Sequence, residues 1–371
     1  MDVCIRTDSS LEIGTGHVMR CLTLAEYLHD QGVEVVFICR KLPGCIVDFI
    51  EAKGLRVCLL LQRDAGPIDE PHHSEHEKWL VVGKETDAAD TGRILAAGER
   101  FPDWLVVDHY ALDSQWERSM RPYVGHIMVI DDLADRSHDC DLLLDQNFYE
   151  NARDRYRNLV PSHCRMLLGP EYGLLRPEFN ELRQRMTERD GTVSRILVFF
   201  GGSDVTNETA KALEAVSALQ RPDIAVDVVI GSSNPHKAQI ESAAHRLANV
   251  RLHYQTQNMA ELMAQADLAI GAGGTTTWER CCLGLPTLAI VVAENQREMT
   301  EAADGQGAVL NMGWREEVSE AAIEARMHWL LEHPDALQKM SQNAVRLSGN
   351  SDHAVGNPVV AAIMEVSRAV F

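Results

Sequence analysis

The sequence has few basic residues, no long apolar run and no C-x-x-C pair. Lys and Arg number 35 against 55 Asp and Glu, so the formal net charge of the 371 residues is −20. Nucleic acids and anionic lipid surfaces are bound through clustered positive charge. The longest apolar runs, such as 285–293, are much shorter than the roughly 18 residues of a membrane span. We therefore expect no nucleic-acid partner and no stable membrane association.

Cysteine usage disfavours a disulfide framework. There are nine cysteines, an odd number, and the adjacent pair Cys281–Cys282 would form a strained bridge. The N-terminus carries a charge at its second residue and lacks an apolar stretch of signal-peptide length. These features predict reduced, mostly buried thiols in a cytoplasmic protein.

Length and hydrophobic pattern predict two α/β domains. The chain exceeds the usual size of one hydrophobic core, and its composition of 45% hydrophobic and 24% charged residues is that of a folded protein. A strand, a turn and a helix recur along the chain, which is typical of parallel sheets covered by helices. We expect Rossmann-like domains at 1–185 and 190–350, joined through a polar stretch at 176–194, and a C-terminal helix within 351–371.

The expected elements follow continuous apolar runs and helical spacing. Strands are predicted at 3–7, 35–39, 56–61, 105–107 and 127–130, and then at 196–200, 225–230, 268–270 and 288–292, the last of them. Helices are predicted at 17–31, 45–52, 207–219, 239–247, 275–283, 319–331, 336–347 and 355–370. In folds of this type the ligand binds at the carboxyl ends of the strands, which predicts a site in a cleft between the domains.

The first candidate site is the loop Ile13 to His17. Gly14 and Gly16 allow a tight turn and close backbone approach to a ligand, and a helix N-terminus follows. The helix dipole disfavours an imidazolium at His17, so we expect a neutral ring that is able to accept a proton from water. Simple turn chemistry for the glycines, and a helix-start role for His17, are the alternatives.

Two further glycine loops lie in the second half of the chain. Gly201, Gly202 and Ser203 follow a predicted strand and offer N–H and hydroxyl donors to a phosphate, although a Gly-Gly turn with a helix cap explains them equally well. Gly273, Gly274 and Thr275 precede another helix. Glu279, one turn into that helix, is placed to accept hydrogen bonds from ribose hydroxyls, or it is a solvated or capping carboxylate. Together the two loops predict a nucleotide diphosphate site.

Other polar residues at strand ends are weaker candidates. Asp108, and the pair Asp131 and Asp132, each follow a buried strand, where a ligand contact and a structural hydrogen bond are both common. Asn295 and Gln296 follow the last predicted strand and are placed to bind sugar or phosphate oxygens. A separate polar loop carries His72, His73 and His76. It has no closed ligand set, so we expect no metal there.

Four segments together resemble PseG, the UDP-sugar hydrolase family of pseudaminic acid biosynthesis. They are R-T-D-S-S-x-E-I-G-T-G-H-V-M-R-C (6–21), V-D-H-Y (107–110), D-D-L-A-D-R-x-H-D-C-D-L-L-L-D-Q-N (131–147) and G-G-S-D (201–204), and the similarity extends over about residues 1–313. That family cleaves UDP-2,4-diacetamido-2,4,6-trideoxy-β-L-altropyranose into UDP and the free sugar. The resemblance implies the GT-B fold of two Rossmann-like domains, like MurG, with UDP on the second and a last helix folding back onto the first.

The resemblance also implies roles for individual residues. His17 is expected to activate water against the anomeric carbon, with inversion and with no metal or other cofactor, and Tyr110 to lie close to the reacting sugar. Glu279 is expected at the ribose, Asn295 at the substrate, and Gly274 with Thr275 at the diphosphate. Arg6, Asp8 and Arg20 of the first segment are expected to bind substrate. The resemblance implies no role for the long segment 62–97 or for its histidines.

Three other functions remain open at this stage. A GT-B glycosyltransferase would use the same donor and replace water by an acceptor hydroxyl. A UDP-sugar 2-epimerase would leave the sugar modified. A UDP-sugar sensor would bind without turnover, and would give no reason for a histidine at the helix start.

Overall fold

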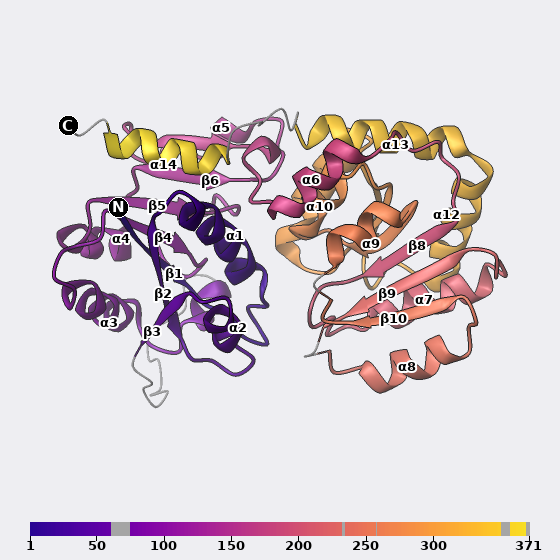
Figure 1. Cartoon of the computed structure of the whole chain (residues 1–371), viewed down its shortest axis with the longest axis horizontal. Helices are drawn as coiled ribbons and strands as arrows, with labels where there is room; N and C mark the ends of the chain where they lie inside the picture. Colours follow the sequence, from indigo (N-terminus) through magenta and orange to yellow (C-terminus); the bar gives the residue numbers. More distant parts are fainter. Residues whose placement is uncertain (61–74, 232–233, 257, 350–356, 369–371) are drawn as a thin grey trace. The chain divides into compact units, whose positions relative to one another are not determined.

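The computed structural model describes residues 1–60, 75–231, 234–256, 258–349 and 357–368, and the chain separates into two compact units. Unit 1 contains Met1–Asn147, Asn151–Leu174 and the described part of His353–Phe371. Unit 2 contains Phe148–Glu150 and the described part of Leu175–Asp352. Each unit is built around one parallel sheet (Figure 1), which confirms the predicted α/β fold class.

The sheet of unit 1 has seven strands in the order β3-β2-β1-β4-β5-β6-β7. All neighbouring strands are parallel. The chain first adds strands on one side of β1 and then returns to the other side with β4, so the strand order reverses between β1 and β4. The strands are β1 Asp2–Thr7, β2 Glu34–Arg40, β3 Arg56–Leu60, β4 Trp104–Asp108, β5 His126–Ile130, β6 Leu142–Asp145 and β7 Arg165–Leu168.

Helices cover both faces of this sheet because successive strand residues point to opposite sides. Trp104 and Val106 of β4 join one apolar cluster with α1, α2 and α14, while Leu105 and Val107 join another with α3 and α4. The helices are α1 Gly16–Asp30, α2 Val47–Ala52, α3 Lys84–Ala96, α4 Ser114–Met120, α5 Ala152–Arg155 and α14 Pro358–Arg368, with short 3-10 turns η1 Glu75–Trp79, η2 Arg121–Tyr123 and η3 Pro170–Tyr172.

Helix α14, drawn in yellow in Figure 1, completes the core of unit 1 from the far end of the chain. It contacts α1, and its Val359 and Ile363 are fully buried in the cluster that α1 shares. The indole nitrogen of Trp104 donates a 2.8 Å hydrogen bond to Ser367 Oγ. The first and last described elements of the chain therefore belong to one hydrophobic core.

Unit 2 repeats this architecture with six parallel strands in the order β10-β9-β8-β11-β12-β13. Its strand order reverses between β8 and β11. The strands are β8 Arg195–Phe199, β9 Ala225–Ile230, β10 Val250–Tyr254, β11 Leu268–Ala272, β12 Thr287–Val291 and β13 Leu310–Trp314. The helical elements are α6 Pro177–Arg185, α7 Glu208–Ala218, α8 Lys237–His245, α9 Met259–Gln265, α10 Thr276–Cys282, η4 Glu294–Gln296, α11 Arg297–Gly305, α12 Glu320–Glu332 and α13 Pro334–Leu347.

Four strands and six helices of the described structure escaped the sequence analysis: β6, β7, β10 and β13, and α3, α4, α5, α6, α9 and α11. Strands β6 and β7 have only four residues each, which is too short for a clear pattern. Strand β10 alternates polar and apolar residues at the sheet edge, and β13 follows the strand that was expected to be the last. The segment 176–194, expected to be a polar junction, contains α6, whose Phe179 is fully buried in the core of unit 2.

Candidate functional site

The reversal of strand order in unit 1 brings two sequence motifs together. Strands β1 and β4 lie side by side, with Thr7 opposite Asp108 at their carboxyl ends. The loop after β1 leads into α1, which begins at Gly16, and the V-D-H-Y segment ends β4. The carboxyl edge at such a reversal is where parallel α/β sheets bind ligands. His17 and Asp108 meet here, although they are 91 residues apart.

His17 and Asp108 form a buried hydrogen-bonded pair. The distance from His17 Nδ1 to Asp108 Oδ1 is 2.6 Å, and the carboxylate is fully buried while the imidazole is 9% exposed. An ionised carboxylate only accepts hydrogen bonds, so the proton of this bond is assigned to Nδ1. When the ring is neutral, its lone pair is then on Nε2. A base oriented by a carboxylate is the arrangement that general-base catalysis uses. The neutral state of His17 stays a prediction.

Asp108 stays ionised because Arg20 donates hydrogen bonds to both oxygens of its carboxylate. Arg20 Nε donates to Oδ2 and Nη2 to Oδ1, both at 2.6 Å. Burial alone would raise the pKa of Asp108, but the charges and hydrogen bonds of Arg20 and His17 hold it well below its ordinary value. Arg20 Nη1 also donates to Asp132 at 3.1 Å. Asp108 and Arg20 were both predicted to bind substrate; the structure places their charged groups against each other and against His17.

Tyr110 lies directly against the imidazole of His17. The two rings meet edge to face with centroids 4.5 Å apart, and the phenol oxygen donates to Asp132 Oδ1. Burial and the neighbouring Asp132 carboxylate raise the pKa of Tyr110 well above its ordinary value. Tyr110 is therefore a neutral hydrogen-bond donor. The structure brings together His17 and Tyr110, the two residues that the sequence analysis predicted to be catalytic.

Arg6 and Asp8, predicted to bind substrate, lie beneath this site. Both are at most 1% exposed, and Arg6 donates two hydrogen bonds to Asp8 and two to Asp87, at distances of 2.7–3.3 Å. Arg40 adds a backbone N–H to Asp8 at 2.7 Å and a guanidinium contact to Asp87 at 2.8 Å. Buried charges are retained when they are paired in this way. These residues hold the ends of β1 and β2 and the start of α3 in place.

The glycines of the first loop have different roles. Gly14 has φ of +77°, a backbone conformation that L side chains rarely adopt, and its N–H donates to the Ser10 carbonyl at 2.9 Å. A Cβ at Gly16 would meet nothing within 4 Å. The backbone conformation therefore explains why position 14 is a glycine. At Gly16, the open space leaves room for a ligand close to the start of α1.

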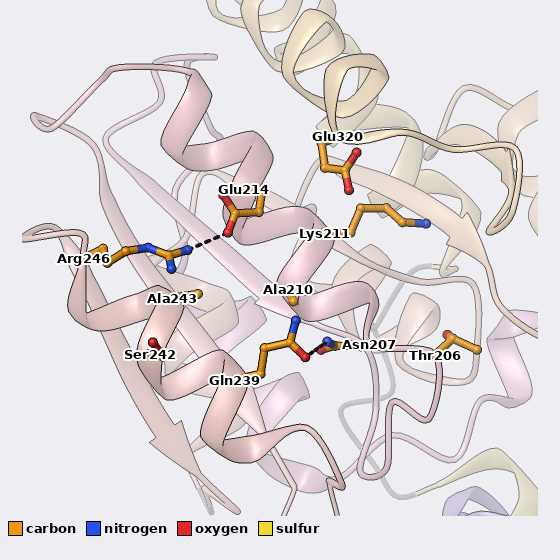
Figure 2. A pocket seen from close by; sticks show the side chains of 10 residues that line it. All are labelled: Thr206, Asn207, Ala210, Lys211, Glu214, Gln239, Ser242, Ala243, Arg246 and Glu320. Carbon is orange, nitrogen blue, oxygen red and sulfur yellow. Dashed lines mark hydrogen bonds and ion pairs between the residues drawn. The ribbon is translucent and has the colours of Figure 1, made fainter.

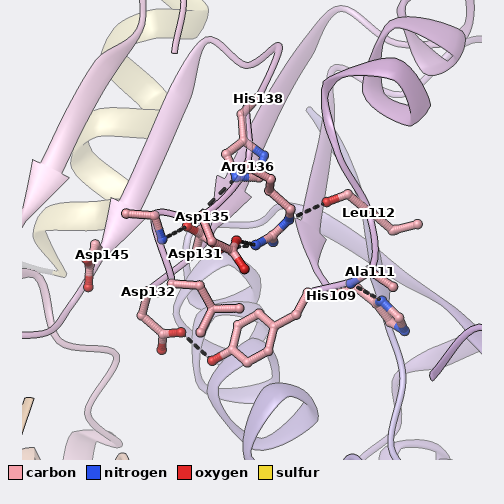
Figure 3. A network of polar contacts seen from close by, with 12 residues as sticks. His109, Ala111, Leu112, Asp131, Asp132, Asp135, Arg136, His138 and Asp145 are labelled. Carbon is pink, nitrogen blue, oxygen red and sulfur yellow. Dashed lines mark hydrogen bonds and ion pairs between the residues drawn. The ribbon is translucent and has the colours of Figure 1, made fainter. Parts of the chain in front are cut away.

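A second buried network supports the acidic end of β5 (Figure 3). Asp131 binds Arg136 at 2.8 Å, and Arg136 Nε donates to the Leu112 carbonyl at 2.7 Å. His138 Nδ1 is 2.7 Å from Glu117 Oε1, and its Nε2 is 3.8 Å from Asp131. Burial lowers the pKa of His138, but these two carboxylates outweigh it and raise the pKa to about 9. The network fixes Asp131 and so the backbone that carries Asp132.

The sequence analysis missed Trp79 on the short turn η1. Its indole stacks on Tyr110, with centroids 5.5 Å apart and planes at 27°, and it meets His17 edge to face at 5.9 Å. His76, weighed only as a metal ligand, contacts both Trp79 and Tyr110 through its ring. His72 and His73 lie outside the described residues. Among the described residues no group of three or more His, Cys, Asp or Glu is arranged to hold a metal.

The glycine loops of unit 2 also follow a reversal of strand order, after β8 and β11. Gly201 has φ of +90°. A Cβ on Gly231, after β9, would lie 2.0 Å from the Gly202 carbonyl oxygen, and one on Gly273 would lie 2.1 Å from Thr300 Oγ1. Close packing of the loops therefore requires glycine at 231 and 273. Glycine at 231 lets the turn after β9 lie against the loop after β8, and glycine at 273 lets the loop after β11 lie against α11.

The remaining predicted residues of unit 2 surround the second of these loops. Gln296 Nε2 lies 3.4 Å from the position of a Cβ on Gly274, and Gln296 Oε1 accepts from Val292 N at 3.1 Å. Asn295, like Thr275 at the start of α10, is exposed, and Ser203 is half-buried. The structure thus gathers Gly273, Gly274, Thr275, Glu279 and Gln296 around the amino end of α10.

Two arginines that the sequence analysis did not select support this loop. Arg176 Nη2 lies 3.2 Å from Glu279 Oε1. Burial raises the pKa of Glu279 above its ordinary value, and the guanidinium of Arg176 opposes that shift. Arg280, 1% exposed, donates to the Ala272 carbonyl at 2.7 Å, and burial lowers its pKa to about 10. Its positive charge therefore lies directly beneath the G-A-G-G loop.

A groove of about 470 Å³ lies elsewhere on unit 2, between α7 and α8 (Figure 2). Two pairs of its polar side chains bind each other: Arg246 pairs with Glu214 at 2.6 Å, and Asn207 donates to Gln239 at 3.0 Å. Residues Thr206, Ala210, Lys211, Ser242, Ala243 and Glu320 complete the lining. It contains none of the predicted site residues, so the two reversal points remain the candidate sites.

Comparison with known proteins agrees with this geometry. Residues 195–355 match the glycosyltransferase family 28 C-terminal domain. The chain is 28% identical to the UDP-2,4-diacetamido-2,4,6-trideoxy-β-L-altropyranose hydrolase of Campylobacter jejuni, over 80% of this chain and 93% of that protein. It is 27% identical to the spore coat polysaccharide biosynthesis protein SpsG of Bacillus subtilis, over 97% and 94%. The chain is thus similar to a PseG-type hydrolase and to SpsG, and it has the GT-B fold.

A solved structure shows the same fold. MurG of Acinetobacter baumannii matches with a TM-score of 0.63 at 14% identity, covering 98% of this chain and 99% of that one.

An uncharacterised protein of Methanocaldococcus jannaschii is 26% identical over 80% of this chain, which spans 57% of that relative's length. The predicted family resemblance and GT-B fold are thus confirmed. No helix in the described part of the chain has both the length and the apolar character to span a membrane.

The Asp108 pair can be tested without any substrate. We expect Asp108→Asn to leave Arg20 facing a neutral amide, and so to lower the free energy of unfolding by about 3–5 kcal/mol. The variant should also lose the preference for a proton on Nδ1 of His17, as read from its ¹⁵N chemical shifts. Asp135→Asn, at a 45% exposed carboxylate in the same unit, is the control and should change stability by less than about 0.5 kcal/mol. An unaltered His17 spectrum in Asp108→Asn would contradict the assignment.

The His138 network predicts a loss of stability at alkaline pH. A histidine whose folded pKa is about 9 stabilises the fold fully below its unfolded value, and this contribution is lost as the pH rises through 9. From an unfolded pKa of about 6.5 the loss amounts to about 3 kcal/mol. Denaturant unfolding between pH 6 and 10 should show this decline in the wild type and in His163→Gln, at a 60% exposed histidine, but not in His138→Gln. Parallel curves of unfolding free energy against pH for all three proteins would contradict the stabilising role of His138.

Proposed function

We propose that the protein hydrolyses a UDP-linked 2,4-diacetamido-2,4,6-trideoxy hexose of the altropyranose type, releasing UDP and the free sugar in pseudaminic acid biosynthesis. The observation that carries the proposal is the Asp108–His17 pair, which directs a basic Nε2 away from the buried carboxylate. The similarity to the Campylobacter jejuni hydrolase supports the substrate class. The glycine loops of unit 2 support a bound nucleotide diphosphate.

In the proposed reaction, water attacks the anomeric carbon in one displacement. His17 Nε2 accepts a proton from the water as its oxygen bonds to C1. The bond between C1 and the UDP oxygen breaks, and UDP leaves with the electron pair. Backbone N–H groups at Gly201, Gly202 and the start of α10, with Arg280 beneath, stabilise the charge that develops on the diphosphate. A single displacement inverts the anomeric configuration and needs no covalent enzyme intermediate.

The residues next to His17 position the reacting groups. Asp108 fixes the orientation of the imidazole and stabilises the imidazolium that forms, and Arg20 keeps Asp108 ionised. Tyr110 donates its hydroxyl proton to Asp132, and its phenol oxygen is then able to accept a hydrogen bond from a sugar hydroxyl. Each of these groups acts by holding a geometry or a proton, so the mechanism requires no metal ion.

A glycosyl transfer is the second candidate, because residues 195–355 match a glycosyltransferase family domain. In that reaction the same base would deprotonate an acceptor hydroxyl instead of water. Product analysis with no acceptor present separates the two: a hydrolase forms UDP and free sugar in equal amounts, whereas a transferase leaves the donor intact. A UDP-sugar 2-epimerase would instead yield a sugar of altered configuration at C2.

Turnover in ¹⁸O-labelled water tests the bond that breaks. We expect the label in the anomeric hydroxyl of the released sugar and none in UDP, because water attacks carbon. Mass spectrometry of both products after a single turnover gives the answer. Label in the terminal phosphate of UDP would mean that phosphorus is attacked, and it would exclude the proposed role of His17.

Substitution of His17 tests the base. His17→Ala should lower kcat by about 10²–10⁴-fold, since this is the usual contribution of a general base. The affinity for UDP, measured by calorimetry, should stay unchanged because the nucleotide binds unit 2. His328→Ala, at a 52% exposed histidine of unit 2, is the control and should retain full activity. Wild-type rates of UDP release from His17→Ala would disprove the assignment.

A further inference from the structure

Trp79 is the aromatic residue of the reaction site that has no role in the mechanism above. Three other tryptophans, Trp104, Trp116 and Trp278, are at most 2% exposed and lie in the hydrophobic cores, whereas Trp79 is only half-buried. Among the described residues, its aromatic contacts are with Tyr110, His17 and His76 of this site and with the buried His109 beside them. Trp79 therefore lines the site, and part of its side chain is exposed.

Stacking on Tyr110 fixes the orientation of the Trp79 indole. The two planes are 27° apart at 5.5 Å, and His17 meets both rings edge to face, at 5.9 Å from Trp79 and 4.5 Å from Tyr110. His76 belongs to the same cluster: the centroid of its ring lies 4.7 Å from that of Trp79 and 5.2 Å from that of Tyr110. An indole is the largest apolar side chain available, and offset or edge contacts between rings stabilise such clusters. The base thus lies beside an extended apolar surface.

An apolar surface next to the base matches the chemistry of a deoxy sugar. A 2,4-diacetamido-2,4,6-trideoxy hexose carries a methyl group at C6 and two acetyl methyls, where common hexoses carry hydroxyl groups. Methyl groups gain free energy by leaving water for an aromatic face. A hydroxyl group in the same place would lose its hydrogen bonds with water and find no partner on the indole.

We propose that Trp79, held by Tyr110 and His76, is the residue that selects the sugar, by packing against the methyl groups of a deoxy-acetamido hexose beside His17. This inference rests on the proposed function and specifies its substrate subsite. It gives η1 a role, although the sequence analysis assigned none to the segment 62–97.

Kinetics with two donors test the selection. The probes are the UDP-2,4-diacetamido-2,4,6-trideoxyhexose and UDP-N-acetylglucosamine, which has a hydroxyl group at C6. Trp79→Ala should lower the ratio of kcat/KM between the two donors by about 10-fold or more, mainly through a higher KM for the deoxy donor. Trp79→Phe, which keeps an aromatic face, should retain most of the ratio. The inhibition constant of UDP should be unchanged in both variants.

Trp329→Ala is the matched control, since Trp329 also contacts a histidine ring, that of His333, but is 41% exposed on α12 of unit 2. It should leave the ratio of the two donors unchanged. An equal loss of kcat/KM for both donors in Trp79→Ala, or a weaker affinity for UDP, would show a structural role for Trp79 and would overturn the proposal.

A binding experiment separates this proposal from the proposed function. In the His17→Ala background, the deoxy donor should change the tryptophan fluorescence, and this change should be absent when Trp79→Phe is added. The same fluorescence change with and without Trp79 would overturn the sugar-selecting role, whatever the wild-type activity. Specific quenching at Trp79 without any hydrolysis by the wild type would instead retain the sugar subsite and reject the hydrolase reaction.

Discussion

The buried carboxylate of Asp108, held between His17 and Arg20, is the interaction on which the reaction site depends. A carboxylate without solvent is costly unless its charge is balanced and its oxygens are hydrogen-bonded. Here Arg20 provides two hydrogen bonds of 2.6 Å and the balancing charge, and His17 provides the third contact. The same arrangement that stabilises Asp108 fixes the proton on Nδ1 of His17. Stability and the orientation of the base therefore have one physical cause.

Further charged residues support this pair from below. Arg6 and Arg40 balance the charges of Asp8 and Asp87 at the ends of β1 and β2 and in α3, and the pKa of Asp8 lies well below its ordinary value because Arg6 and His109 outweigh its burial. On the other side, Glu117, His138 and Asp131 hold the turn that carries Asp132. The groups proposed to be catalytic in unit 1 are thus surrounded by layers of paired charge, which restrict their positions.

Local signals allowed the sequence to predict a large part of the site. Glycines before a helix marked His17, and the end of a buried strand marked Asp108, whereas the resemblance to PseG pointed to Tyr110. Their partners were not predictable. Trp79 stands in a polar segment without a strand or helix pattern, and Arg176 lies in a stretch that was expected to be a polar junction, so no local pattern connected either residue with the site. The sequence analysis also did not foresee the pairing of Arg6 with Asp8 and of Arg20 with Asp108, and the substrate contacts predicted for these residues stay predictions.

The sequence by itself determined the alternation of strands and helices, the two parallel sheets and the residue types suited to bind a nucleotide sugar, because these depend on hydrophobic periodicity and on glycine, which act over a few residues. Only the tertiary structure decided which strands became neighbours. The reversal of strand order sets β1 beside β4 and β8 beside β11, and it thereby joins His17 to Asp108 across 91 residues. Hydrogen bonding between strands and the burial of both sheet faces select that order, and these forces act between segments that are distant along the chain.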